Sequence, residues 1–158
     1  MINVRNLART WAGNFTEIVT ITNPSKPTED TSKKEERKNM IVICARVHPG
    51  ETNSSFVCEG LMEFLLGSSV EAENIRNQYL IKIIPFLNPD GVIHGNYRTS
   101  SAGVDLNRRW KNPDPEVCPE IFQLKKFFSE TEYKTTLFID LHGHSKKRSS
   151  FMYGCFNN

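Results

Sequence analysis

Two nearly continuous apolar segments constrain the fold of this chain more than any other feature. Met40–Val47 and Thr136–Leu141 are rich in β-branched and large apolar residues, and polar residues hardly interrupt them. Such runs are typical of strands covered on both faces, because a strand with one wet face alternates apolar and polar residues. Each run is followed directly by a histidine, which places His48 and His142 at the ends of two expected strands.

Two more segments are expected to be strands, and the order of elements predicts the fold class. Glu17–Thr22 and Tyr79–Leu87 are β-rich, and Phe151–Phe156 is a candidate start of another strand. Helical patterns lie between these strands, which is the element order of an α/β fold with a layered sheet. In such folds ligands gather beyond the strand ends, where His48 and His142 stand.

Two segments show the spacing of amphipathic helices. The first follows Glu51, has Thr52 or Asn53 as its expected N-cap, and ends at Gly67. Its expected core face consists of Phe56, Val57, Gly60, Leu61, Phe64 and Leu65. The second helix, Pro119–Ser129, is expected to bury Ile121, Leu124 and Phe128.

Composition and charge exclude several classes of protein. A chain of 158 residues suffices for one domain, and its net charge of +2, without a basic stripe, argues against nucleic-acid binding. No stretch approaches the roughly 20 apolar residues of a membrane span, and the N-terminus lacks the apolar core of a signal peptide. We therefore expect a cytoplasmic protein that does not bind membranes.

Residues 23–39 and the cysteines are expected to be structural. Pro, Lys, Glu and Ser dominate residues 23–39, which is typical of a solvated loop. Cys44, Cys58, Cys118 and Cys155 show no C-x-x-C spacing, and two of them lie inside apolar runs. Reduced thiols in the core are therefore expected, rather than disulfides or a cysteine zinc site.

His48, Glu51 and His142 form the most informative constellation. Pro49 and Gly50 place His48 and Glu51 on a turn, where a separation of three residues can bring both side chains to one side. Two imidazoles and one carboxylate are the ligand set of a catalytic zinc ion that keeps a fourth position open for water. The set predicts zinc-assisted hydrolysis, although H-x-x-E by itself is more often a solvated His and Glu.

Two other clusters carry polar groups with specific chemistry. Asn88–Gly91 (N-P-D-G) directly follows a strand and is interpreted mainly as a tight turn. Asn107 and Arg108 combine an amide with a guanidinium, and together they could hold the terminal carboxylate of a peptide. Arginines in surface loops are mostly solvated, so both interpretations stay open on spacing alone.

Several longer motifs are more specific than any of these clusters. They read A-R-V-H-P-G-E-T-N-S-S, I-I-P-F-L-N-P-D-G-V-I-H-G-N-Y-R, G-V-D-L-N-R-R-W, D-L-H-G-H-S-K-K and F-M-Y-G-C. Over nearly the whole chain from about Leu7, they resemble the M14 zinc carboxypeptidases, and within them the cytosolic carboxypeptidase subfamily. The resemblance implies a helix/mixed-sheet/helix fold and an enzyme that trims glutamates from tubulin and other acidic protein tails.

The resemblance also implies a ligand set for one zinc ion per chain. His48, Glu51 and His142 would bind the metal, as in the related His-His-Glu zinc enzymes. His144 is a rival to His142, because both could share one face of an extended segment. Asp105 would accept a hydrogen bond from the His48 ring, so that the other ring nitrogen faces the metal.

The same resemblance implies roles in substrate binding. Asn107 and Arg108 would bind the C-terminal carboxylate of the substrate. Arg98 would stabilise the oxyanion that develops on the scissile carbonyl.

One expected group has no counterpart in the sequence. The general base of the family is a Glu on a strand downstream of the third ligand, and no Asp or Glu follows Asp140. We therefore expect residues 1–158 to be a partial catalytic domain, incomplete at the C-terminus. Two alternatives are an inactive fragment that binds zinc and peptide tails, and an α/β domain whose His and Glu are structural.

Overall fold

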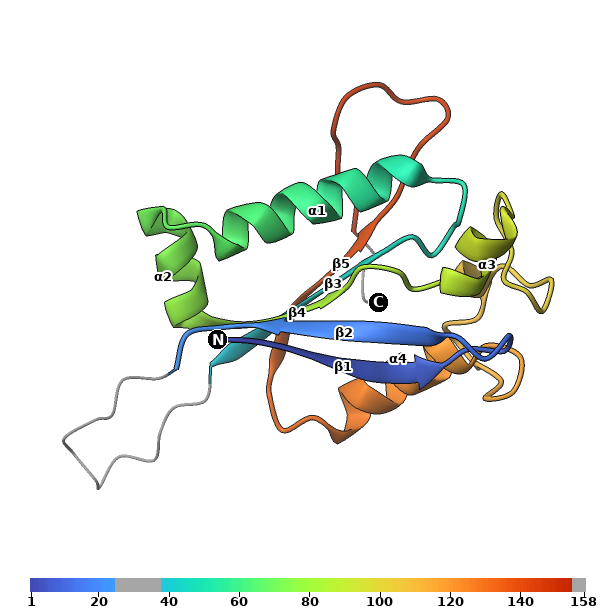
Figure 1. Ribbon diagram of the computed structural model, residues 1–158, viewed down its shortest axis with the longest axis horizontal. Coiled ribbons are helices and arrows are strands. Elements are labelled where there is room, and N and C mark those ends of the chain that lie inside the picture. The colour runs from blue at the N-terminus through green and yellow to red at the C-terminus, as the bar shows by residue number, and fades with distance from the viewer. Residues whose placement is uncertain (25–37, 155–158) are drawn as a thin grey trace.

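One mixed sheet organises the computed structural model, which describes residues 1–24 and 38–154 (Figure 1). Five strands lie in the order β1-β2-β4-β3-β5. Their bounds are β1 Ile2–Arg9, β2 Phe15–Ile21, β3 Asn39–Ala45, β4 Tyr79–Ile84 and β5 Thr135–Leu141. β3 runs parallel to both β4 and β5, whereas β2 is antiparallel to β1 and β4. The segments that leave β3 and β5 therefore reach the same edge of the sheet.

Helices cover both faces of the sheet. α1 (Thr52–Leu66) and α2 (Val70–Gln78) connect β3 to β4. α3 (Pro89–His94), the short 3-10 helix η1 (Leu106–Arg108) and α4 (Pro119–Glu130) connect β4 to β5. Figure 1 shows α1 and α4 on opposite sides of the sheet. The expected layered helix/mixed-sheet/helix fold is confirmed.

Two buried clusters join these layers. The first includes Ile121 of α4 and Val42 of β3, and the second includes Cys58 of α1 and Ile43 of β3. Neighbouring residues of β3 thus enter opposite clusters, as the side-chain period of a strand requires. A strand with both faces buried needs the apolar composition that the sequence shows for this segment.

The four main strands expected from the sequence are confirmed with shifted ends. Met40–Val47 is strand only as far as Ala45, and Tyr79–Leu87 ends at Ile84, before Pro85, which has no N–H for a ladder. β1 and α2 were not expected. Most of β1 is exposed and α2 is largely polar, so neither carries a strong apolar pattern.

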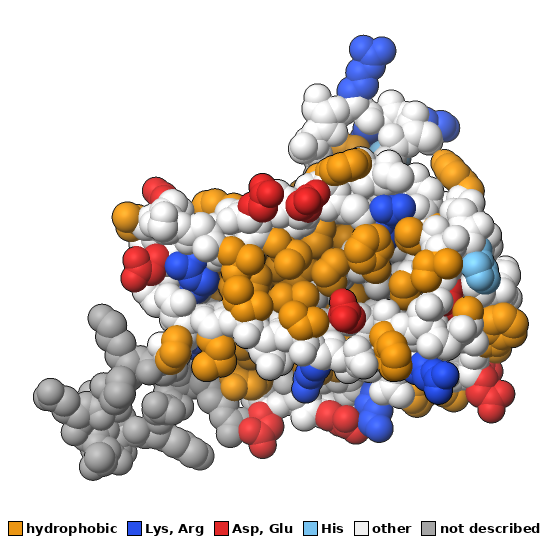
Figure 2. All heavy atoms as spheres, viewed as in Figure 1, with side chains coloured by type: hydrophobic (Ala, Val, Ile, Leu, Met, Phe, Trp, Pro, Cys, Tyr) orange, Lys and Arg blue, Asp and Glu red, His pale blue; other side chains and the backbone are white. Residues whose placement is uncertain are grey.

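The expected core face of α1 is partly wrong. Phe56, Val57 and Phe64 are 71%, 54% and 42% exposed, whereas Cys58 and Leu65 are buried. α1 carries two neighbouring apolar stripes, and helical spacing alone does not tell which of them contacts the sheet. The side chains of the exposed stripe therefore face solvent. Figure 2 shows a broad hydrophobic area between α1 and strands β1 and β2.

Two further local expectations are corrected. α1 begins at Thr52 and its N-cap position is Glu51, whose side chain makes no cap hydrogen bond because it contacts histidines instead. Thr52 and Asn53 are therefore not the cap. Of the candidate strand Phe151–Phe156, residues 151–154 are not a strand, and its last two residues lie outside the described part.

Asn88–Gly91 begins a helix and is not an isolated tight turn. Asn88 is the N-cap of α3, and its side-chain oxygen accepts a hydrogen bond from the amide of Gly91 at 3.0 Å. Pro89 fits the first helical turn, where no N–H is needed. Asp90 is fully buried and accepts a hydrogen bond from Ala12 at 2.8 Å, which ties α3 to the β1–β2 connection.

The expectations for the cysteines, for the loop and for membrane spans are tested only within the described residues. Cys44, Cys58 and Cys118 are buried free thiols, as expected, while Cys155 and residues 25–37 of the expected loop lie outside the description. The described helices include none with the length and apolar character needed to cross a membrane.

Candidate metal centre

The loop from β3 to α1 is held in place by its neighbours. Asn88 donates from Nδ2 to the carbonyl of Val47 at 3.1 Å, and the Gly50 amide donates to the carbonyl of Tyr97 at 2.7 Å. A Cβ on Gly50 would lie 2.6 Å from the Tyr97 ring, so the close approach requires glycine. His48, within this loop, is only 4% exposed and has a fixed position.

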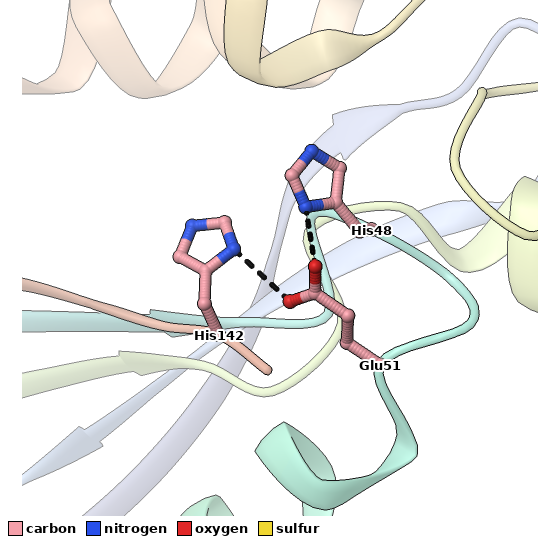
Figure 3. Close-up of side chains that lie close together, drawn as sticks. All are labelled: His48, Glu51 and His142. Carbon is pink, nitrogen blue, oxygen red and sulfur yellow. Dashed lines mark hydrogen bonds and ion pairs between the residues drawn. The ribbon is translucent and has the colours of Figure 1, made fainter. Parts of the chain in front are cut away.

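The three candidate ligands lie together at the carboxyl ends of β3 and β5 (Figure 3). Nδ1 of His48 is 2.9 Å from Oε1 of Glu51, and Nδ1 of His142 is 3.1 Å from Oε2 of the same carboxylate. The centroids of the two imidazole rings are 5.0 Å apart. One ligand atom from each residue lies within 4.8 Å of the other two, which is close enough to share a metal ion.

In each of the two histidines, the ring nitrogen that points away from Glu51 contacts another carboxylate. Nε2 of His48 is 3.2 Å from Oδ1 of Asp105, and Nε2 of His142 is 2.7 Å from Oδ2 of Asp140. Because an ionised carboxylate only accepts hydrogen bonds, these contacts favour a proton on Nε2 and a lone pair on Nδ1. Both lone pairs then face the negative charge of Glu51. A cation between them removes this repulsion, so the donor set fits a metal ion.

Hydrogen bonds shift the pKa of two groups at the site. The hydrogen bond to Asp140 raises the pKa of His142, although burial opposes the shift. Burial alone would raise the pKa of Asp105, but hydrogen bonds from Arg98 and His48 outweigh it and lower that pKa. Asp105 is therefore ionised at neutral pH, as the acceptor for the His48 ring must be.

The candidate substrate-binding residues differ in how closely they approach the three candidate metal ligands. Arg98 donates from Nε to Oδ2 of Asp105 at 2.7 Å, and its side chain is 42% exposed. Asn107 places Nδ2 3.5 Å from Nε2 of His142. The Arg108 side chain is exposed, and its Nη1 atom lies 3.5 Å from the carbonyl oxygen of Asn107. Asn107 and Arg98 thus lie at the site, and Arg108 lies at its margin.

His144 lies apart from the three candidate ligands. Its side chain is exposed, and Nδ1 accepts hydrogen bonds from the amides of Lys146 and Lys147 at 3.1 and 3.0 Å. Its ring packs edge-on against Phe151, with centroids 5.2 Å apart. Nδ1 of His144 is therefore engaged in a local turn and does not face Glu51.

Sequence reasoning missed three groups that orient the ligands. Asp140 contacts His142, the Gly143 amide donates to Oε2 of Glu51 at 2.6 Å, and Asn53 donates to the carbonyl of His142 at 3.1 Å. Asp140 had a detectable signal, because residues i and i+2 of an extended segment share a face. The Asn53 and Gly143 contacts depend on tertiary packing and have no comparable signal.

Comparison with known proteins agrees with this geometry. The zinc carboxypeptidase family, peptidase M14, matches residues 1–155. Cytosolic carboxypeptidase 1 of Danio rerio is 44% identical over 154 residues, covering 95% of this chain and 13% of that protein. Cytosolic carboxypeptidase 2 of Mus musculus is 43% identical over 157 residues, covering 98% and 18% respectively. The chain thus spans less than a fifth of the length of these relatives.

Solved structures of metallo-carboxypeptidases are similar to this chain as well. A metallo-carboxypeptidase from Burkholderia cenocepacia superposes with a TM-score of 0.78 at 32% identity, over 90% of this chain and 37% of its own. A metallo-carboxypeptidase from Pseudomonas aeruginosa, in complex with (2-guanidinoethylmercapto)succinic acid, gives 0.74 at 28% identity, over 89% and 35%.

A layered α/β sheet with a His/Glu/His group at the ends of parallel strands is the arrangement of a metal-dependent hydrolase domain. The chain belongs to the zinc carboxypeptidase family, and within it the chain is similar to cytosolic carboxypeptidases. The resemblance inferred from the motifs is confirmed, and zinc is the metal of this family.

Proposed function

We propose that this domain forms the zinc site and part of the substrate site of a carboxypeptidase that removes C-terminal residues from protein tails. The observation that carries the proposal is the convergence of His48, Glu51 and His142, with an outer carboxylate behind each imidazole. In the proposal these three residues bind one zinc ion per chain, and His144 does not. Bound zinc would polarise the scissile carbonyl and acidify a water molecule.

The chain's own residues would orient the substrate. Arg108 would bind the terminal carboxylate with its two-pronged guanidinium, and Asn107 would add an amide donor for the same anion. Asp105 fixes Arg98 through Nε, which leaves the two Nη groups of Arg98 to stabilise an oxyanion. An exposed arginine beside a buried metal site is suited to a ligand that arrives from solvent.

Cationic residues close in sequence to His142 and Asn107 support glutamate as the residue removed. Lys146, Lys147 and Arg148 are exposed and follow His142 closely in the chain, and Arg108 and Arg109 are exposed near Asn107. Because clustered charge of one sign raises the local concentration of ligands of the other sign, these cations favour acidic tails such as those of tubulin. We also propose that the protein acts in the cytoplasm, in keeping with the names of its relatives.

The general base is proposed to come from outside the described residues. Glu51 faces both histidines, Asp105 contacts His48 and Arg98, and Asp140 contacts His142. A carboxylate committed to such partners is poorly placed to accept a proton from water. This observation also favours the alternative that residues 1–158, taken alone, bind zinc and peptide tails without catalysis.

The experiment that tests the proposal compares two matched peptides. A glutamate-tailed peptide with a free C-terminus should bind the zinc-loaded chain, and its C-terminally amidated form should bind much more weakly, because only the first offers a carboxylate to Arg108. Calorimetry at fixed salt measures both affinities. Equal affinity for the two peptides would refute the role in C-terminal recognition.

A further inference from the structure

Asp140 joins the candidate metal centre to a buried thiol. Its Oδ2 atom contacts Nε2 of His142, and its Oδ1 atom lies 3.2 Å from Sγ of Cys44. Sheet register fixes this second contact, since Cys44 of β3 is paired directly with Asp140 of β5 in the parallel ladder. Cys44 is completely buried. The chain of contacts therefore runs from the sheet interior through Asp140 to a metal-facing imidazole.

The two outer carboxylates of the site have different partners. Asp105 is paired with the guanidinium of Arg98, which neutralises part of its charge. Within the part of the chain that the structure describes, Asp140 has no cationic partner except the His142 ring itself, and Cys44 supplies its other side-chain contact. A thiol is a weak, uncharged donor, so it orients a carboxylate with little loss of its charge.

Burial keeps Cys44 in the form that this contact requires. Removal from water, with the charge of Asp140 next to it, raises the pKa of the Cys44 thiol well above its ordinary value. Cys44 therefore remains protonated and donates to Asp140. Because Cys44 is inaccessible, a role as nucleophile or exposed metal ligand is excluded.

We propose that Cys44 and Asp140 are positioning residues for zinc binding. The Cys44 thiol holds the Asp140 carboxylate, and this carboxylate sets the orientation and basicity of the His142 ring. Outer partners of this kind fix which ring nitrogen faces a metal, and their loss lowers metal affinity about 10- to 100-fold. The inference rests on the proposed zinc centre and adds two residues that act through His142 and not on the metal.

The first test replaces Asp140 with Asn, which keeps the shape of the side chain and removes its charge. Zinc affinity of the chain, measured by competition with a chelator, should fall about 10- to 100-fold. The visible absorption of the cobalt-substituted chain should change as well, because the imidazole is no longer held in one orientation. A folded Asp140→Asn variant with unchanged affinity would overturn the proposal.

The second test examines Cys44 with a matched cysteine. Cys44→Ala should weaken zinc binding several-fold, Cys44→Ser should restore most of the affinity through its hydroxyl donor, and Cys58→Ala should have no effect. Cys58 is also buried, with 2% of its surface exposed, but it belongs to the cluster on the α1 side of the sheet. Equal affinities of Cys44→Ala and Cys58→Ala would contradict the role of Cys44, even if Asp140→Asn fails to fold.

A double variant shows whether Cys44 acts through Asp140. Adding Cys44→Ala to Asp140→Asn should cause no further loss of zinc affinity, because the carboxylate that the thiol holds is already gone. Fully additive losses would mean that Cys44 acts by another route. Failure of the unmodified chain to bind zinc would instead refute the proposed metal centre, so the two failures are distinguishable.

Discussion

Arg98 and Asp105 form an ion pair, with Nε of Arg98 2.7 Å from Oδ2 of Asp105. The other oxygen of the same carboxylate lies 3.2 Å from Nε2 of His48. One side chain therefore orients both a proposed metal ligand and a proposed oxyanion-stabilising group. Metal binding and substrate binding should consequently depend on the same residue.

Replacement of Asp105 by Asn should weaken both functions together. Zinc affinity should fall about 10- to 100-fold, because the outer partner of His48 loses its charge. Binding of a glutamate-tailed peptide to zinc-saturated protein should also weaken, since Arg98 is no longer held. Chelator competition and calorimetry measure the two effects, with the exposed Glu63→Gln in α1 as a control. A loss confined to one of the two affinities would argue against the shared role.

Arg108→Lys keeps the positive charge and removes the two-pronged geometry. Affinity for a free C-terminal glutamate peptide should fall about tenfold, on the order of the 1–2 kcal/mol that separates a bidentate from a single charged hydrogen bond. Arg109→Lys changes the neighbouring exposed arginine and should leave this affinity unchanged. If Arg108→Lys keeps the full affinity, general positive charge and not a clamp at Arg108 explains binding.

Glu120 should make the folding stability depend on pH. Both of its carboxylate oxygens are buried without a hydrogen-bond partner among the described residues, and burial raises its pKa to about 7. The folded chain thus binds more protons than the unfolded chain between about pH 4.5 and pH 7. The contribution of Glu120 to the free energy of unfolding is therefore fully present below about pH 4.5 and is lost as the pH rises through about 7.

Glu120→Gln should remove this pH dependence. At pH 8 the variant should be more stable than the unmodified chain by up to about 3 kcal/mol, and at pH 4.5 the two should be similar. Urea unfolding at both pH values measures the difference, and Glu116→Gln, an exposed residue just before α4, is the control. A variant that is equally stabilised at both pH values would show that ionisation of Glu120 is not the cause.

Two glycines provide a matched test of how the His48 loop is held. A Cβ on Gly91 would lie 2.3 Å from Cγ of Pro49, beside His48, whereas a Cβ on Gly60 would meet nothing within 4 Å. Gly91→Ala should therefore displace the loop, weaken zinc binding and destabilise the fold by about 1–3 kcal/mol. Gly60→Ala should stabilise α1 by about 0.5–1 kcal/mol, since alanine is the better helix former. Zinc affinity equal to that of the unmodified chain in Gly91→Ala would contradict the packing argument.

The sequence predicts the layers of the fold and the three candidate ligands because both depend on strong local signals. Continuous apolar runs identify β3 and β5, and each run ends directly before a histidine. The Asn88 segment was misjudged because N-P-D-G suits a turn and also suits the capped first turn of a helix. Local pattern could not separate these two structures.

What the sequence could not reveal depends on contacts between distant segments. The Cys44–Asp140 contact joins residues that only the pairing of β3 with β5 brings together. The exposed stripe of α1 was misassigned for a related reason, since spacing identifies apolar stripes without telling which one meets the sheet. Both results follow from tertiary packing.

Zinc stoichiometry in two histidine variants tests the central claim most directly. The unmodified chain and His144→Ala should each bind one zinc ion, whereas His142→Ala should lose stoichiometric binding, because His142, unlike His144, places Nδ1 at Glu51. Dialysis followed by elemental analysis gives the metal content, and circular dichroism verifies that each variant is folded. The account would be contradicted if folded His142→Ala retained one zinc ion while folded His144→Ala lost its zinc.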